Sequence, residues 1–139
     1  MQKAIVNKWL RDFLATIDTA FLATADAEGQ PYLQHRGGPK GFIRAVDEHT
    51  LAFIDYSGNR QYISQGNLED NDKVFLFLID FANRRRVKVW GTATMEDIGN
   101  DQRLCRITVT RWDINCPQHI NRAGVVPAEQ DCDGRDTTA

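Results

Sequence analysis

The sequence has only three cysteines, no long apolar run and little net charge. Cys105, Cys116 and Cys132 lack closely paired spacing, which argues against a disulfide framework and against a zinc ribbon. A formal net charge of -2 gives no general electrostatic reason to bind nucleic acid or an anionic membrane. No segment approaches the length of a membrane span, and polar residues interrupt the first 18 positions where a signal peptide would be continuous. We therefore expect a cytoplasmic protein.

Familiar catalytic motifs are also missing from the sequence. It contains no G-x-S-x-G, no GxGxxG and no Walker loop, and His35, His49 and His119 are scattered along the chain. A metal site built from His35, His119 and a cysteine stays open, although the spacing does not favour it. Any redox chemistry would therefore have to come from a bound cofactor.

Apolar periodicity predicts one domain of mainly antiparallel β-structure. Spacings of three and four residues predict an amphipathic helix over 5–17, and a short helix is expected after Ser57. Alternation or apolar runs predict strands at 20–25, 30–36, 42–46, 50–56, 73–81, 86–95 and 106–114. The run at 73–81 is so apolar that burial on both faces is expected. These elements favour a small antiparallel barrel with helices outside, over residues 1–120, followed by a flexible tail at 121–139.

The stretch QHRGGPKG, residues 34–41, is the first of three polar clusters that could bind a ligand. Gln34, His35 and Arg36 end a predicted strand, and three glycines then surround Pro39 and Lys40. Side chains and backbone N–H groups here could line a ligand, but an ordinary Gly-Pro loop with a solvated cation explains the same residues.

The second cluster lies where a predicted strand gives way to a helix. Ser57 and Asn59 are good helix caps and need no ligand. Arg60, however, places a cation in the first helical turn, where it opposes the helix dipole. A bound anion, such as a phosphate, would resolve that conflict.

The third cluster, RRRVKVWG, places Arg86, Lys88 and Trp90 on one face of a strand. The two cations repel each other unless they are solvated or neutralised by an anion. An exposed basic face is the simple explanation, although a large aromatic residue is more often buried or in a contact.

Taken in order, residues 17–96 resemble the pyridoxamine 5'-phosphate oxidase-like, FMN-binding split-barrel proteins. The stretch WDINCPQHI at 112–120 resembles the C-terminal signature of an oxidase-related flavin-binding branch. The resemblance implies a split β-barrel with flanking helices, and a homodimer that binds FMN at the interface between its subunits. It also implies an FMN-dependent oxidoreductase whose substrate and catalytic residues are unknown.

The resemblance further implies a set of cofactor-binding positions. From the first subunit these are Gln34, His35, Arg36, Gly38, Lys40, Tyr56, Ser57, Asn59, Arg60 and Gln61. Arg60 would pair with the FMN phosphate, with help from Lys40, because Gln61 stands where the oxidases carry a lysine. Arg86 and Lys88 would reach FMN from the partner subunit, and Trp112, Gln118 and His119 would close the site near the ring. Backbone N–H groups of Gly37, Gly38 and Gly41 could tune the ring.

The chain departs from the true oxidases after residue 120, where no arginine and histidine pair for pyridoxal phosphate is found. Pyridoxamine phosphate oxidation is therefore not expected. A flavin carrier or sensor without turnover, a haem protein with His35 or His119 as axial ligand, and an F420-binding protein remain alternatives. A purely structural interaction domain would leave Arg60, Arg86 and Lys88 without a shared purpose.

Overall fold

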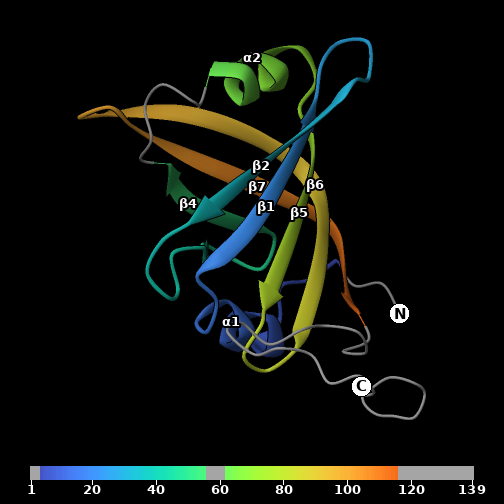
Figure 1. The fold of residues 1–139 in the computed structure, drawn as a ribbon, viewed down its shortest axis with the longest axis vertical. Helices are drawn as coiled ribbons and strands as arrows, with labels where there is room; N and C mark the ends of the chain where they lie inside the picture. Colours follow the sequence, from blue (N-terminus) through green and yellow to red (C-terminus); the bar gives the residue numbers. More distant parts are fainter. Residues whose placement is uncertain (1–3, 56–61, 116–139) are drawn as a thin grey trace, which may run out of the picture.

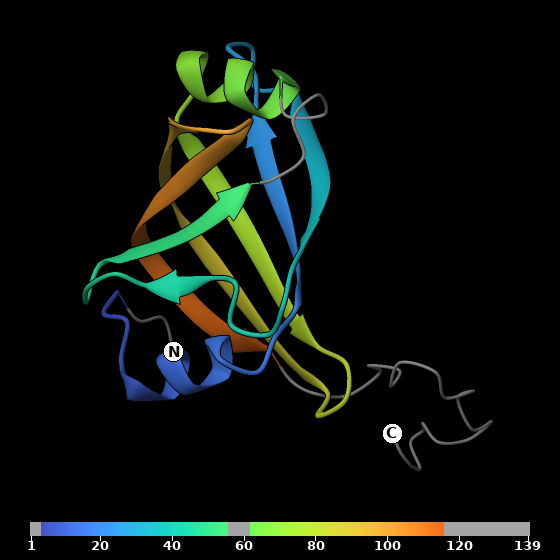
Figure 2. The same cartoon turned by 90° about the vertical axis from the view of Figure 1, so that its left-hand side faces the viewer.

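The chain folds as a seven-stranded antiparallel sheet curled into a split β-barrel, with one helix at each end (Figures 1 and 2). The computed structural model describes residues 4–55 and 62–115, and gives the backbone alone for 62–65 and 115. Its helices are α1 (Lys8–Leu14) and α2 (Tyr62–Asp70). Its strands are β1 (Thr19–Ala25), β2 (Pro31–Gly37), β3 (Arg44–Ala45), β4 (Thr50–Asp55), β5 (Lys73–Asp80), β6 (Arg85–Gly99) and β7 (Gln102–Asn115).

The order of strands in the sheet is β2-β1-β5-β6-β7-β4-β3, and every pairing is antiparallel. β2 and β3 are thus the two edges of the sheet. Within the described residues no backbone ladder joins β2 to β3 or β4, so the barrel is split there. The long strands β6 and β7 pair along most of their length, and their register shifts at Gly91. A Cβ atom at Gly91 would overlap the carbonyl oxygen of Thr108, so the close approach of the two strands at this register shift requires glycine.

Alternate residues of the strands fill the barrel interior. Fully buried side chains include Leu22 of β1, Leu76 of β5 and Val89 of β6. α1 closes one end of the barrel with Leu10 and Phe13, as the amphipathic pattern predicts. Burial of these side chains is the main source of stability.

Both predicted hairpins and the two predicted helices are present, with shifted boundaries. The predicted last strand begins at Gln102 instead of 106, because Asn100 and Asp101 form a tight turn with φ of 56° and 58°. Positive φ at both turn residues is the geometry of a type I′ hairpin, and asparagine and aspartate tolerate it best after glycine. β6 and β7 are therefore one long hairpin.

The expectation of burial on both faces of 73–81 is wrong for the single chain. Val74, Leu76 and Leu78 are buried in the barrel, whereas Phe75 and Phe77 are half-exposed on its outer surface.

Among the described residues, the helices are too short or too polar to cross a membrane.

Candidate functional site

Strand alternation separates the three predicted ligand residues of β2. Gln34 and Arg36 pair with Leu22 and Ala20, whose side chains are buried, so both point into the barrel. His35 points outward and packs edge-on against Phe21, with 5.4 Å between ring centroids. One face of β2 therefore does not present all three side chains, and their predicted contact with a cofactor stays a prediction.

Arg36 forms a buried ion pair with Asp55 across the split of the barrel. Its Nε donates to Oδ2 of Asp55 at 3.1 Å, and its Nη1 donates to the carbonyl oxygen of His35 at 3.1 Å. The two side chains are only 7% and 3% exposed. Arg36 thus joins the edge strand β2 to the end of β4.

The thiol of Cys105 is buried near this ion pair. Burial and the negative charge of Asp55 raise the pKa of Cys105 to about 12, although the positive charge of Arg36 acts in the opposite direction. At neutral pH the thiol is protonated, and so it is not a nucleophile. Within the described residues, no group of three histidine, cysteine or acidic side chains could hold a metal ion.

A pocket of about 560 Å³ lies between the loop after β2 and the side of β4 and β7 that points away from the barrel interior. We call it the Lys40 pocket. Residues 39–42 form one wall, and Ala52 and Ile54 of β4 form the other. Lys40, Arg44 and Arg106 supply positive charge, and Arg106 forms a long, exposed ion pair with Glu96 at 3.8 Å. The pocket therefore combines apolar strand residues with a cationic edge.

The backbone of the loop is anchored away from this pocket. The N–H of Gly38 donates to the carbonyl oxygen of Asp18 at 3.3 Å, and that of Gly41 donates to Ile17 at 3.0 Å. Gly41 has a φ of +81°, which favours glycine. The expectation that N–H groups of Gly38 and Gly41 tune a flavin ring is therefore wrong: these donors already have partners.

Arg86 and Lys88 point to the same side of β6 as Trp90, away from the barrel interior, as alternation predicts. The Nζ of Lys88 lies 5.9 Å from the Trp90 ring centroid, and the guanidinium of Arg111 lies 3.9 Å from it. Phe75 packs against the same tryptophan, with 5.2 Å between centroids. We call this aromatic and cationic surface the outer face; it consists of the half-exposed Phe21, Phe75, Phe77, Lys88 and Trp90 and of the exposed His35, which packs on Phe21.

Trp112 is a core residue. It is 0% exposed, stacks on Trp9 and donates from Nε1 to the carbonyl oxygen of Ile5 at 2.8 Å. This leaves it no surface to offer a cofactor, which corrects the expectation that it closes the site. Its indole N–H and ring are instead used to hold the segment before α1 against β7.

The remaining predicted positions lie outside the described residues: Tyr56, Ser57, Asn59, Arg60, Gln61, Gln118 and His119. Of the described ones, Lys40 lines the pocket, His35 and Lys88 belong to the outer face, and Gln34 and Arg36 point inward. Among the described positions, Lys40 is thus separated from Gln34 and Arg36 inside the barrel and from His35 and Lys88 on the outer face.

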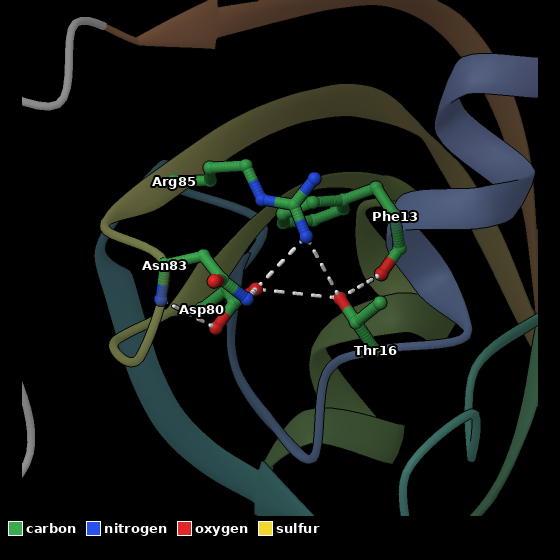
Figure 3. Close-up of polar contacts among 5 residues, drawn as sticks. All are labelled: Phe13, Thr16, Asp80, Asn83 and Arg85. Carbon is green, nitrogen blue, oxygen red and sulfur yellow. Dashed lines mark hydrogen bonds and ion pairs between the residues drawn. The ribbon is translucent and has the colours of Figure 1, made fainter.

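A polar network at the β5–β6 hairpin has no counterpart in the sequence predictions (Figure 3). Asp80 accepts hydrogen bonds from Arg85 at 3.0 Å and from the side chain of Asn83 at 2.9 Å. Arg85 also donates to the hydroxyl of Thr16 at 3.3 Å, and its guanidinium lies over the ring of Phe13. The network fastens this hairpin to the C-terminal end of α1. Its sequence signal is weak: an aspartate that accepts from the N–H of an asparagine three positions later.

These contacts set the ionisation of Asp80. Burial raises its pKa, but hydrogen bonds from Asn83 and Arg85, together with the charge of Arg85, outweigh burial. The pKa of Asp80 therefore lies below its ordinary value of 3.8, and the group is an anion at neutral pH.

A model of the family described as pyridoxamine 5'-phosphate oxidase matches residues 6–130 of the chain. No curated protein matches it significantly in sequence.

Solved structures share the fold at low sequence identity. HupZ from Group A Streptococcus is 23% identical with a TM-score of 0.59, and the match covers 85% of this chain and 98% of HupZ. An FMN-binding protein from Syntrophomonas wolfei is 10% identical with a TM-score of 0.53, covering 75% and 82%. HutZ, the haem storage protein of Vibrio cholerae, is 16% identical with a TM-score of 0.53, covering 75% and 89%. Proteins of this fold thus bind different ligands, FMN in one case and haem in another.

Proposed function

Because the chain belongs to the pyridoxamine 5'-phosphate oxidase family, we propose that it is an FMN-binding flavoprotein and an oxidoreductase. The observation that supports this most directly is the Lys40 pocket. Its volume of about 560 Å³ lies within the usual range for small-molecule sites. Its apolar strand residues suit a flat ring, and its cations suit a phosphate.

The described residues are chemically suited to FMN. Lys40, Arg44 and Arg106 can make charge-assisted hydrogen bonds to phosphate oxygens. Arg60 follows β4, which forms one wall of the pocket, and we assign it the main ion pair with the phosphate. Bound FMN would supply electron or hydride transfer at its ring, while the protein supplies binding and exclusion of water. We assign no residue as catalytic acid or base.

We further propose that two copies pair through the outer face. Phe21, Phe75, Phe77 and Trp90 are only half-buried in one chain, and a second copy would cover them. Arg86 and Lys88 lie on the same side of β6 as Trp90, so they would lie at the interface of such a pair. Light scattering should give the mass of a dimer, and a Trp90→Glu variant should give that of a monomer. A monomeric wild type would contradict this pairing.

The decisive experiment is a visible absorption spectrum of the purified protein, followed by titration with FMN, FAD, F420 and haem. Yellow protein with a preference for FMN would support the proposal. Protein that binds none of the four would overturn it. Bound flavin that reoxidises in air, but accepts electrons from no tested donor, would instead favour a carrier or sensor.

A single substitution tests the phosphate assignment. Arg60→Ala should weaken FMN by about 2 kcal/mol, close to 30-fold, because it removes a charge-assisted hydrogen bond. Lys8→Ala removes a cation from an exposed position on α1 and should leave the affinity unchanged. Equal FMN affinity in the Arg60 variant would exclude this arginine as the phosphate partner.

Haem is the second candidate ligand, because His35 is exposed on the outer face and HutZ has the same fold. A Soret band that is lost in His35→Ala would establish it. F420 is a third, since an F420 reductase is also similar in fold, at 16% identity. The same titration separates the three.

A further inference from the structure

The Arg36–Asp55 ion pair occupies a particular place in the architecture. β2 is one edge of the sheet, and β4 lies next to the other edge. No ladder joins β2 to β4 among the described residues, so side chains must hold the split together. Figure 2 shows β4 running across the barrel toward β2. The 3.1 Å contact between Arg36 and Asp55 bridges that split.

The same two residues adjoin the two walls of the Lys40 pocket. Arg36 lies three positions before residue 39, where the loop wall begins, and the loop starts at Gly38. Asp55 directly follows Ile54, which belongs to the β4 wall. The ion pair therefore joins the strand that leads into one wall to the strand that forms the other.

Two other contacts tie the far end of the loop to β4: Phe42 packs edge-on against Phe53, with 6.2 Å between ring centroids, and the loop leads into β3, which pairs with β4. The loop is anchored to the segment before β1 through Gly38 and Gly41, which fixes its far side. β4 is held by β7 and β3, on the other side of the split. The buried pair adds the tie at the near end of the loop, between β2 and the end of β4, and its geometry is specific because guanidinium and carboxylate must align.

We infer that Arg36 and Asp55 form a clip across the barrel split that positions the two walls of the Lys40 pocket, and that Arg36 is not itself a phosphate ligand. The part that concerns the ligand rests on the proposed binding of FMN. The clip itself depends only on the described geometry.

The substitution Asp55→Asn distinguishes a clip from a ligand. If Arg36 bound the phosphate directly, neutralising its carboxylate partner would leave FMN affinity unchanged or increase it. If the pair is a clip, Arg36→Gln and Asp55→Asn should both weaken FMN by at least about tenfold, the scale known for residues that orient metal ligands. The double variant should then be no weaker than the worse single variant, because both remove the same contact.

Asp80→Asn provides a matched control. Asp80 is a similarly buried carboxylate, paired with an arginine at 3.0 Å, but it belongs to the β5–β6 hairpin and does not line the pocket. It should lower the melting temperature while changing FMN affinity less than twofold. An equal loss of affinity in this control would mean that general destabilisation explains the effect, and would overturn the clip.

Hydrogen exchange without ligand tests the clip separately from FMN binding. Asp55→Asn should speed amide exchange in residues 38–43 and 50–55, whereas Asp80→Asn should leave these segments unchanged. This holds even if the wild type proves not to bind FMN. If Asp55→Asn does not fold, Asp55→Glu keeps the charge, alters the geometry and should show the same pattern more weakly. Unchanged exchange in both segments would overturn the inference.

Discussion

Two arginine–aspartate pairs in this protein have similar distances but different surroundings. Arg36 and Asp55 are 19 positions apart, meet across the split of the barrel, and are 7% and 3% exposed. Arg85 and Asp80 are five positions apart, lie in one hairpin, and are 35% and 6% exposed. The first pair bridges strands that no ladder joins, whereas the second adds to strands already paired along their length.

The difference shows that the distance between two charges says little about their importance. A local pair in a hairpin has backbone hydrogen bonds and the Asn83 donors beside it, so its loss is partly compensated. No ladder joins the two strands that carry the buried pair across the split. Burial also makes it costly to leave one charge without its partner. The effect of breaking a pair should therefore follow burial and topology.

The largest effect is expected from Asp55→Asn. The substitution leaves the guanidinium of Arg36 buried opposite a neutral amide, and we expect unfolding to become easier by about 3 kcal/mol. Urea denaturation of the variant and the wild type measures this directly. A loss below about 1 kcal/mol would mean that the split is held by other contacts.

Arg85→Met should have a smaller effect. It removes one hydrogen bond to Asp80, one to Thr16 and the stacking over Phe13, but Asn83 still donates to the carboxylate. Arg85 is also partly solvated, which weakens its ion pair. We expect a loss of about 1–2 kcal/mol in the same denaturation experiment. A loss equal to that of Asp55→Asn would contradict the ranking by burial.

Acid should remove the contribution of Asp80. Its pKa is lower in the folded than in the unfolded protein, so the stabilisation is complete above about 3.8 and is lost as the pH falls through the folded value. The stability difference between the wild type and Asp80→Asn should therefore be constant from pH 7 to about 5 and shrink below pH 4. A difference that does not change at low pH would mean that the carboxylate is not stabilised as an anion.

Much of the fold could be predicted from the sequence, because it depends on local patterns. The alternation of Val87 and Val89 with Arg86 and Lys88 gives the two faces of β6, and the helical spacing before Ile17 gives α1. The turn at Asn100 and Asp101 was not predicted, because two polar residues next to a region of weak alternation give little signal. The split, by contrast, depends on which edges fail to pair, and single-strand patterns do not contain that information.

The candidate site was predicted less well, for two physical reasons. Gln34, His35 and Arg36 were grouped by sequence, although period-2 alternation sends His35 away from its neighbours. Trp112 looked like a site residue because its stretch resembles a family signature, but burial and its bond to Ile5 give it a core role. Arg44 and Arg106 were not predicted, because nothing along the chain shows that they meet at one pocket.

The smallest effect is expected from the exposed pair on α1, which completes the series. Lys8 and Asp12 approach to 2.8 Å, closer than either buried pair, yet their side chains are 88% and 66% exposed. Water and salt screen such a pair, so Lys8→Gln should change the free energy of unfolding by about 0.5 kcal/mol or less. Denaturation in low and high salt should show that even this small difference disappears as screening increases. A loss above about 1 kcal/mol that persists in high salt would show that short distance, and not burial, determines the strength of these pairs.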